Sequence, residues 1–407
     1  MGGVLKPCNE VETARVLSWA MAERKSLELV AGGTKRSIGR PMQTENTLNL
    51  SELTGISLYE PGELVLSAKA GTAVSDIKTV LEGQNQQLAF DPPDLSQFLR
   101  SSAKIGTIGG AVATNLSGPR RISAGAARDH LLGMRAVTGR AETVNIGGRV
   151  MKNVTGYDLC KLLAGSWGTL VAMTEVTLKV VPRPEAEMTT VVFGLSIDEA
   201  VRAMSVALGS SASVSGAAHF SAKLAARSEI SEVSLFKKSV TALRIEGFLP
   251  SVRARKDILA NALKSFGEVE TLDENISPRV WREVRDVTLF DSASEDAIWR
   301  ISTVPGRAPD VVRNISRCEN FEALYDWGGG RIWLMQPGYG DGGAEVIRTV
   351  LDRFGGHAML MRASPEMRSA VNVFEPQSDP VAALTRRIKA AYDPYAILSP
   401  GRMYAGV

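Results

Sequence analysis

Two stretches of the chain combine glycine, small hydroxyl residues and cations at short spacing. The first follows an apolar run at residues 27–30 and contains Gly32, Gly33 and Thr34 before two basic residues. The second places Gly109 and Gly110 just after Thr107. Exposed backbone N–H groups beside small hydroxyls suit the oxygens of a pyrophosphate. The first stretch is not a P-loop, because the pattern G-x-x-x-x-G-K-[ST] is absent there.

Both stretches also have a plain structural interpretation. Glycine serves tight turns wherever the backbone needs a positive φ, and the Lys-Arg pair at 35–36 is also typical of a solvated surface hairpin. Glycine nonetheless recurs across residues 103–182, in segments such as 115–119, 128–133, 152–159 and 168–170. So many turns in one region indicate backbone that approaches something bulky. The residues alone leave a ligand cradle and a loop-rich β-domain equally open.

Few residues could ligate a metal or act as a general base. The histidines are His130, His219 and His357, and the three cysteines lie far apart without a C-x-x-C pair. This excludes a cysteine-ligated iron–sulfur cluster within the chain and a histidine-rich metal site. We expect no metal, although one histidine with carboxylates stays formally open. His130, which follows Arg-Asp, is a candidate base that we interpret as a structural histidine.

One glycine motif is misleading. Residues 338–343 satisfy G-x-G-x-x-G between an expected strand and an expected helix. A dinucleotide-binding Rossmann unit needs an acidic residue after the next strand, about 20 residues further on. The chain instead has the apolar run 358–361 followed by Arg362, and Pro337 precedes the first glycine. We therefore predict a surface turn.

Caps and periodicity predict the elements that position these residues. Asn9 with Glu12 predicts a helix start. The apolar face of that helix is expected at four positions: Val11, Ala14, Leu17 and Met21. Helix starts are also expected at Thr72, at Ser196 with its capping-box partner Glu199, and at Ser251. Strands are expected at 189–193, 240–247, 297–303, 331–335 and 358–361, which together with helices predict a second α/β or α+β unit.

Length and composition bound the class of protein. At 407 residues the chain is too long for one ordinary core, so we expect two domains with a boundary near 182–184. It is 44% hydrophobic and 22% charged with a net charge of +3, unlike a nucleic-acid-binding or polybasic membrane-binding protein. No apolar run approaches the ~18 residues of a membrane-spanning helix, and no signal-peptide core is present at the start. We expect a cytoplasmic protein.

Four sequence blocks resemble one flavoprotein family. They are GTIGGAVATNLSGPRR, RDHLLGMRAVTGRAE, GGRVMKNVTGYDLCKLLAGSWGTL and EVTLKVVPRPE, and residues 392–402 are similar to D-P-x-x-I-L-x-P-G-R. The blocks resemble the FAD-binding (E-type) subunits of glycolate oxidase, in the vanillyl-alcohol oxidase/p-cresol methylhydroxylase (PCMH) superfamily. The resemblance implies a two-lobed α+β fold. It comprises a PCMH-type FAD-binding domain at 1–184, a smaller α/β cap domain at 185–385, and a segment at 386–407 that returns to the FAD-binding domain.

The resemblance implies FAD as the cofactor. Several superfamily members carry, in the loop equivalent to 31–41, a histidine that bonds covalently to the flavin. This loop has none, so we expect non-covalent FAD. The residues expected to bind it are Gly32, Gly33, Thr34, Lys35, Arg36, Ser37, Pro92, Thr107, Gly109, Gly110, Thr114, Asn115, Ser117, Gly118, Asp129, Tyr157, Val176 and Arg402.

The resemblance also implies partners. Catalytic subunits of glycolate and D-lactate dehydrogenases carry E-H-G-x-G and G-H-x-G-D-G-N-x-H in the cap domain, and neither occurs here, so no catalytic residue is assigned. We expect a glycolate oxidase (glycolate dehydrogenase) subunit that oxidises glycolate to glyoxylate together with a catalytic FAD subunit and an iron–sulfur subunit. Such a complex would be cytoplasmic or peripheral at the inner membrane. A free-standing FAD-dependent oxidoreductase of 2-hydroxy acids or alcohols, and a flavin-free assembly scaffold, remain as alternatives.

Overall fold

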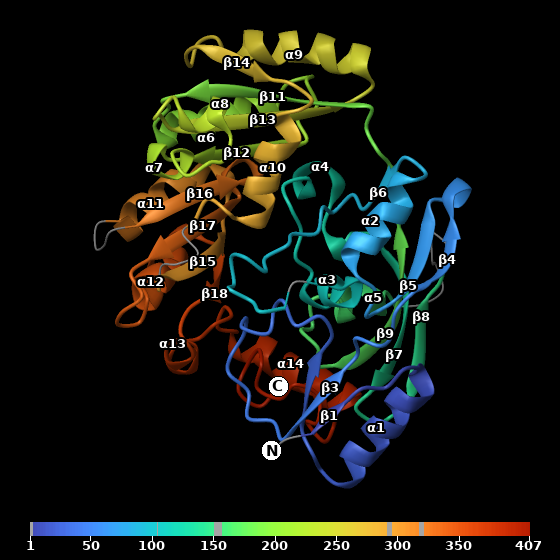
Figure 1. The fold of residues 1–407 in the computed structure, drawn as a ribbon. Helices are drawn as coiled ribbons and strands as arrows, with labels where there is room; N and C mark the ends of the chain where they lie inside the picture. Colours follow the sequence, from blue (N-terminus) through green and yellow to red (C-terminus); the bar gives the residue numbers. More distant parts are fainter. Residues whose placement is uncertain (1–2, 104, 150–156, 291–294, 317–320) are drawn as a thin grey trace. The chain divides into compact units, whose positions relative to one another are not determined.

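The computed structural model describes residues 3–103, 105–149, 157–290, 295–316 and 321–407. The chain forms two compact units, whose ribbons are drawn in Figure 1. The first contains Met1–Ser117, Gly125–Arg183 and Pro376–Val407, and the second contains Gly118–Ala124 and Pro184–Glu375. The chain thus passes from the first unit to the second after Arg183, next to the boundary expected at 184. The sequence analysis did not predict that residues 118–124 belong to the second unit. Residues 152–156 of the glycine-rich blocks, and Cys318, lie outside the described residues.

The described residues of the first unit form two sheets and a short ribbon. One sheet is parallel with the order β1-β3-β2, and the other is antiparallel with the order β4-β5-β9-β7-β8. Their strands are β1 (Val4–Leu5), β2 (Leu27–Val30), β3 (Asn46–Asn49), β4 (Ile56–Glu60), β5 (Val65–Lys69), β7 (Leu131–Thr138), β8 (Thr143–Gly147) and β9 (Val171–Lys179). The ribbon pairs β6 (Gln86–Gln87) with β10 (Val181–Pro182). Strand β9 is the central strand of the larger sheet, so its residues Val176 and Leu178 are fully buried.

Helices cover these sheets. They are α1 (Glu10–Ala22), α2 (Val74–Glu82), α3 (Ile108–Thr114), α5 (Leu159–Leu163) and α14 (Asp379–Tyr392). The predicted cap of α1 is confirmed, because the Asn9 side chain accepts a hydrogen bond from the Glu12 N–H. The predicted face of α1 is partly wrong, because Val11 is exposed and Thr13 is buried. Thr13 is buried without penalty because its hydroxyl donates to the Asn9 carbonyl. Thr72 is not a helix cap: its hydroxyl bonds to the backbone of Gly55, and α2 begins after Ala73.

The C-terminal residues 376–407 belong to the first unit. Leu398 forms a parallel bridge with Leu27, and the Leu27 N–H donates to the Ile397 carbonyl. The buried Lys389 ammonium donates to the carboxylate of Asp393 and to the carbonyls of Thr169 and Leu398. This ion pair fixes the turn after α14, so the tail extends the edge of the β1-β3-β2 sheet.

An eight-stranded antiparallel sheet is the frame of the second unit, in the order β14-β11-β13-β12-β16-β17-β15-β18. Its strands are β11 (Ala186–Phe193), β12 (Gly216–Phe220), β13 (Val240–Gly247), β14 (Val269–Leu272), β15 (Ala297–Ser302), β16 (Glu322–Asp326), β17 (Arg331–Gln336) and β18 (His357–Arg362). All five strands predicted in this region are confirmed, with ends that differ by a few residues. The molecule therefore mixes helices with mainly antiparallel sheets, as α+β proteins do.

The helices of the second unit are α4 (Arg121–Ala124), α6 (Ile197–Leu208), α7 (Ala222–Ala225), α8 (Ser231–Ser234), α9 (Leu249–Leu263), α10 (Ser277–Asp286), α11 (Ala308–Ser316), α12 (Ala344–Phe354) and α13 (Pro365–Ala370). Helices α9, α6, α11 and α12 contact one another in that order, and we call them the helical layer. Figure 1 shows α11 and α12 side by side against β16–β18. Helix α10 contacts β11.

At two helix starts in the second unit, the predicted first residues can be compared with the structure. The capping box of α6 is confirmed by reciprocal hydrogen bonds between Ser196 and Glu199. The predicted start at Ser251 is wrong, because α9 begins at Leu249 with Pro250 in its first turn. Proline fits the first turn of a helix, where its missing N–H costs no hydrogen bond. The G-x-G-x-x-G motif is a turn ahead of α12, as predicted.

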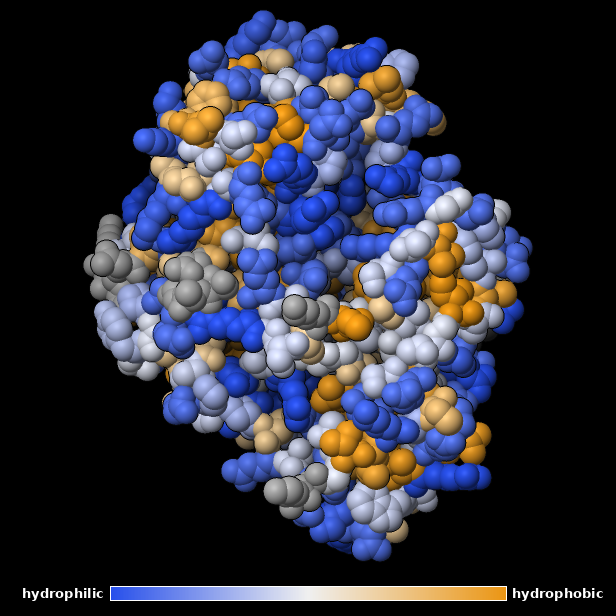
Figure 2. Space-filling view, in the orientation of Figure 1, coloured by the Kyte–Doolittle hydropathy of each residue, from blue (hydrophilic) through white to orange (hydrophobic). Residues whose placement is uncertain are grey.

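The surface visible in Figure 2 is mainly hydrophilic, with hydrophobic residues in small groups. Large apolar side chains that are exposed lie in separate parts of the chain: Val11 is on α1, Leu235 follows α8 and Phe248 precedes α9. Among the described residues, no helix is both long and apolar enough to cross a membrane.

Candidate cofactor site

A pocket in the first unit is lined by segments that are far apart in the sequence. It opens beside the end of β2, and counting its open part it spans about 750 Å³. Its walls come from the loop after β2, from α3, from the start of β9 and from the C-terminal tail. The lining residues are Leu29, Val30, Ala31, Gly32, Gly33, Thr34, Lys35, Arg36, Leu50, Ala70, Thr107, Gly109, Gly110, Ala113, Thr114, Trp167, Gly168, Val171, Met173 and Arg402.

Two glycines are required by close backbone contacts beside this pocket. A Cβ on Gly32 would lie 1.8 Å from the carbonyl oxygen of Ile105, and a Cβ on Gly109 would lie 2.7 Å from the Cβ of Ala70. Gly33, with φ at +78°, has the left-handed conformation that glycine adopts most readily. Gly32 therefore allows the β2 loop to approach residue 105, and Gly109 allows α3 to approach Ala70, just after β5.

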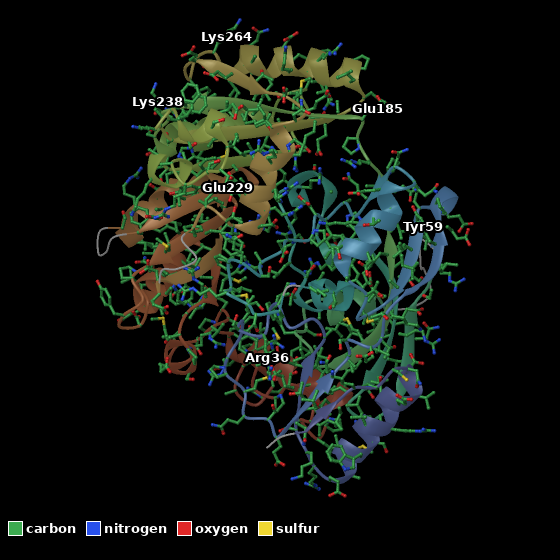
Figure 3. All side chains as sticks on the ribbon, in the orientation of Figure 1. Arg36, Tyr59, Glu185, Glu229, Lys238 and Lys264 are labelled. Atoms are coloured by element: carbon green, nitrogen blue, oxygen red, sulfur yellow. The ribbon has the colours of Figure 1, made fainter. Side chains whose placement is uncertain are left out.

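Three cationic residues line the wall, Lys35, Arg36 and Arg402, and they differ in their environment. Burial lowers the pKa of the Lys35 ammonium to about 8, and the carboxylate of Asp94 opposes this shift only in part. Arg402 donates from Nη2 to the Lys35 carbonyl at 3.0 Å, and its guanidinium lies over the Trp167 ring. Arg36, labelled in Figure 3, forms an ion pair with Glu28. Lys35 is thus a cation that an anionic ligand would stabilise.

The hydroxyls in the wall support helix α3. The Thr107 oxygen accepts from the N–H of Gly110 at 3.3 Å, and the Thr114 hydroxyl donates to the Gly110 carbonyl at 2.8 Å. Thr107 is therefore the N-cap of α3, which places Gly109 and Gly110 against the pocket. The N–H groups of Gly109 and Gly110 already donate to the Ala70 carbonyl and the Thr107 oxygen. The backbone of the β2 loop, the incompletely compensated ammonium of Lys35 and the anchored guanidinium of Arg402 line one cleft, and this combination fits a diphosphate.

Ten of the eighteen residues expected to bind FAD line this pocket. They are Gly32, Gly33, Thr34, Lys35, Arg36, Thr107, Gly109, Gly110, Thr114 and Arg402. The sequence analysis did not single out the apolar lining residues Leu50, Trp167 and Met173. Trp167 and Gly168 belong to the block GGRVMKNVTGYDLCKLLAGSWGTL, which resembles the flavoprotein family. That resemblance could have identified Trp167 as a pocket residue.

The other eight expected residues lie outside the pocket lining. Three of them fix turns after α3: Asn115 accepts from the Arg128 N–H, Ser117 from the Ala127 N–H, and Asp129 from the Ala126 N–H. The Gly118 carbonyl accepts from the Trp327 indole within the second unit.

The remaining four are Ser37, Pro92, Tyr157 and Val176. Ser37 is exposed in the β2 loop, and Pro92 is buried in the segment after β6. Tyr157 is 91% exposed, whereas Val176 is fully buried in the core. The next residue, Asp158, caps α5 by accepting from the Lys161 N–H.

The histidines give no general base beside this pocket. His130 is buried and packs against Phe90, and it does not line the pocket. His219 contacts the Thr241 hydroxyl in the core of the second unit, and burial lowers its pKa to about 4. Among the described residues, no group of three or more His, Cys, Asp or Glu side chains could hold a metal.

Comparison with known proteins gives the cofactor and the family. Residues 2–147 match the model of an FAD binding domain. The chain is 31% identical over 386 residues to the glycolate oxidase subunit GlcE of Escherichia coli (strain K12), covering 95% of each chain. It is 25% identical over 434 residues to the glycolate oxidase subunit GlcD of Bacillus subtilis (strain 168), covering 99% of this chain and 88% of that one.

The fold has solved counterparts as well. The structure of p-cresol methylhydroxylase superposes with a TM-score of 0.70 and 13% identity, over 99% of this chain and 88% of that one. This likeness confirms the PCMH-type fold expected from the sequence. The pocket, the matched FAD binding domain and the identity to GlcE agree on the cofactor, which is FAD. The chain belongs to the family of FAD-dependent oxidoreductases that includes the glycolate oxidase subunits.

Proposed function

We propose that this chain is the FAD-carrying subunit of a glycolate-oxidising complex, working with a catalytic FAD subunit and an iron–sulfur subunit. The observation that carries the proposal is the likeness to GlcE over 95% of both chains. In this proposal the first unit is the FAD-binding domain, the second is the cap, and residues 376–407 complete the FAD-binding domain.

The chain's own residues favour binding of the flavin over independent turnover. Oxidation of a 2-hydroxy acid needs a base for the hydroxyl proton, and a positioned base contributes typically ~10²–10⁴ in rate. Both histidine motifs of the catalytic relatives are absent from the sequence, and His130 and His219 are buried. FAD supplies the hydride-accepting chemistry when bound, and the protein supplies its position and surroundings.

The FAD is proposed to be non-covalent. The diphosphate would be held by the backbone of residues 32–36 with the charges of Lys35 and Arg402. The pocket lining within the described residues includes no histidine, cysteine or tyrosine that could form the usual tether. The protein's part is therefore to orient the flavin and to compensate the diphosphate charge.

The visible spectrum of the purified chain tests the cofactor. We expect a flavin spectrum, and acid precipitation should release all of the yellow colour into the supernatant. Flavin that stays on the denatured chain would contradict the non-covalent assignment. A chain that purifies colourless and does not take up added FAD would support the scaffold alternative.

Turnover and partners need a second experiment. We expect glycolate to leave the flavin of the isolated chain oxidised, and the reconstituted three-subunit complex to reduce a dye with glycolate. The three chains should co-purify, and omission of this chain should abolish the activity of the complex. Dye reduction by this chain alone, at the rate of the complex, would overturn the proposal in favour of a free-standing oxidoreductase.

A further inference from the structure

A buried lysine of the first unit joins three segments of the chain. Lys389 lies on α14, and its side chain is only 5% exposed. Its ammonium donates to the Asp393 carboxylate at 2.8 Å, to the Thr169 carbonyl at 2.7 Å and to the Leu398 carbonyl at 2.9 Å. An ammonium has three N–H donors, so each donor of Lys389 has an acceptor from a different segment. Lys389 therefore holds protein groups in place.

The partner carboxylate fixes the turn that follows α14. The Asp393 side chain is fully buried, and besides the ammonium it accepts from the N–H groups of Ile397 at 3.0 Å and Leu398 at 2.8 Å. Hydrogen bonds to an ionised acceptor are stronger than those between neutral groups. The turn between β7 and β8 packs closely against the carboxylate, because a Cβ on Gly139 would lie 2.3 Å from an Asp393 oxygen.

Two of the segments that Lys389 joins continue into walls of the candidate flavin pocket. Trp167, just ahead of Thr169, lines this pocket, and so does Arg402, in the tail beyond Leu398. The Arg402 guanidinium lies 5.6 Å from the centroid of the Trp167 ring, so the two walls meet. Lys389 does not line the pocket itself, and any effect on a ligand must pass through these walls.

The tail also holds both ends of the loop after β2. Ahead of the loop, the Ser399 hydroxyl oxygen accepts from the Leu29 N–H at 3.1 Å. Beyond the glycines, Arg402 donates to the Lys35 carbonyl at 3.0 Å, and its own carbonyl accepts from the Arg40 N–H at 2.9 Å. The position of the tail therefore sets the position of the loop that carries Lys35.

Each of the two walls contains a residue in an unfavourable backbone conformation. The angle φ is +55° at Trp167 and +41° at Ser399, in the left-handed region that residues with a Cβ seldom adopt. Such residues persist only where surrounding contacts hold them, and they cluster at binding sites. The contacts of Lys389 to the Thr169 and Leu398 carbonyls act next to both of these residues.

We propose that Lys389 and Asp393 are positioning residues for FAD. Their buried ion pair keeps the walls at 167–169 and 398–402 in the arrangement that binds the flavin. The inference rests on the proposed placement of FAD in this pocket, and it goes further because neither residue lines the pocket. All the segments involved belong to the first unit. If the pair served the stability of the fold alone, its loss would leave the FAD affinity of the folded protein unchanged.

Titration of the full-length, FAD-free protein with FAD, followed by the quenching of flavin fluorescence, tests the pair. K389M takes the ammonium away from the Thr169 and Leu398 carbonyls and should weaken FAD binding about 10-fold or more. The double variant K389M/D393N removes both charges, so it leaves no unpaired charge in the interior. It should weaken FAD binding to a similar extent, and it decides the matter if K389M does not fold.

The matched control is E246Q, which removes one partner of a buried ion pair in the second unit. It should lower the melting temperature as K389M does, but its FAD affinity should be that of the unsubstituted protein. Unchanged FAD affinity in a folded lysine variant would overturn the proposal, and so would an equal loss of affinity in E246Q. Glycolate takes no part in this titration, so its outcome is independent of whether the complex oxidises glycolate.

Hydrogen exchange on the unsubstituted protein gives a second measurement that requires no variant. If the ion pair favours the arrangement that binds FAD, bound FAD must favour the ion pair by the same factor. FAD should therefore slow exchange about 10-fold at the Ile397 and Leu398 amides, which donate to Asp393. Equal exchange rates at these amides with and without bound FAD would contradict the coupling. An unsubstituted protein that binds no FAD would overturn both this inference and the proposed flavin site.

Discussion

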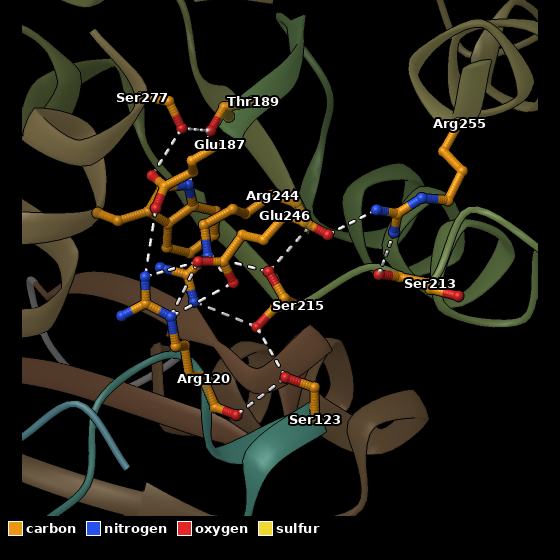
Figure 4. Close-up of polar contacts among 11 residues, drawn as sticks. Arg120, Ser123, Glu187, Thr189, Ser213, Ser215, Arg244, Glu246, Arg255 and Ser277 are labelled. Carbon is orange, nitrogen blue, oxygen red and sulfur yellow. Dashed lines mark hydrogen bonds and ion pairs between the residues drawn. The ribbon is translucent and has the colours of Figure 1, made fainter. Parts of the chain in front are cut away.

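The flavin pocket of the first unit and the ion-pair network of the second unit use charge in opposite ways. In the network, shown in Figure 4, Arg120 donates from Nη2 to Glu246 at 2.6 Å and to Glu187 at 3.3 Å. Arg244 lies 3.4 Å from the second oxygen of Glu246. In the pocket, by contrast, Lys35 has no carboxylate within ion-pair distance among the described residues, and only Asp94 acts on it from further away.

The pKa values show the consequence. Burial alone would raise the pKa of Glu246, but the guanidiniums of Arg244 and Arg120 together lower this pKa to about 2. Burial raises the pKa of the neighbouring Glu187, which Ser277 holds by a hydrogen bond from its hydroxyl. Arg120 is thus compensated by carboxylates of its own unit. The ammonium of Lys35 lacks such a partner among the described residues, which agrees with its proposed part in holding the diphosphate.

The largest expected effect comes from breaking the network. E246Q leaves Arg120 and Arg244 without their common carboxylate, and loss of one partner from a buried ion pair costs about 3–5 kcal/mol. We expect the free energy of unfolding to fall by about that amount in urea titrations, without a change in the affinity of the remaining folded protein for FAD.

The control for E246Q is D198N, which removes the exposed carboxylate that pairs with Arg313. Exposed pairs contribute about 0–1 kcal/mol, so D198N should unfold almost as the unsubstituted protein does. Equal stabilities of E246Q and D198N would show that the network is no more structural than a surface pair.

The second prediction concerns the backbone of the pocket. In G32A the new Cβ would meet the Ile105 carbonyl, which is backbone and cannot rotate away, so the β2 loop must shift. Overpacking costs about 1–3 kcal/mol, and we expect a loss of FAD affinity of ~10–100-fold, measured by fluorescence quenching of the flavin. G62A, where nothing lies within 4 Å of the new Cβ, should bind FAD normally.

The third prediction removes the cation of the pocket. K35M should bind FAD about 10-fold more weakly, because one charge-assisted hydrogen bond is lost. Neighbouring K25M removes an exposed lysine paired with Glu45, and it should leave FAD affinity unchanged. FAD affinity in K35M equal to that of K25M would exclude Lys35 from the diphosphate site.

The fourth and smallest effects concern the pH dependence of stability, which should differ between the two units. In FAD-free protein the pKa of Lys35 is about 8, below the ordinary value of 10.5, so the unfolded chain binds more protons between these pH values. Stability of the FAD-free protein should therefore rise from pH 8 toward 10.5, with a slope of at most about 1.4 kcal/mol per pH unit from this group. FAD affinity should fall over the same interval, because the diphosphate needs the charged ammonium, and K35M should show neither change.

The second unit should respond at acid pH instead. His219 has a pKa of about 4 when folded, against 6.5 as the ordinary value, so stability should fall as the pH drops from 6.5 toward 4. H219Q keeps a polar group near Thr241 and does not titrate, so its slope in this interval should be smaller. The same slope in both proteins would assign the acid response to other groups.

Much of the local structure was predictable because its signals lie within a few residues of each other. Asn9 and Glu12, and Ser196 and Glu199, are close enough for the sequence to specify the hydrogen bonds that start two helices. The strand at 240–247 was predicted with both ends correct. The prediction that Val11 is buried was wrong, because periodicity gives the spacing of residues on a helical face but not which face packs against the rest of the protein.

The glycine spacing predicted turns after β2 and near residues 106–110, but it predicted neither helix α3 nor a ligand. The resemblance added the expectation of FAD and, at the far end of the chain, Arg402. Only the tertiary structure decided that these segments meet in one pocket with Trp167 and Met173. The same is true of Arg120, which meets Glu187 and Glu246 although they are 67 and 126 residues away. A residue's type specifies what it can bind, but its partners are set by the path of the chain, and no local signal in the sequence records that path.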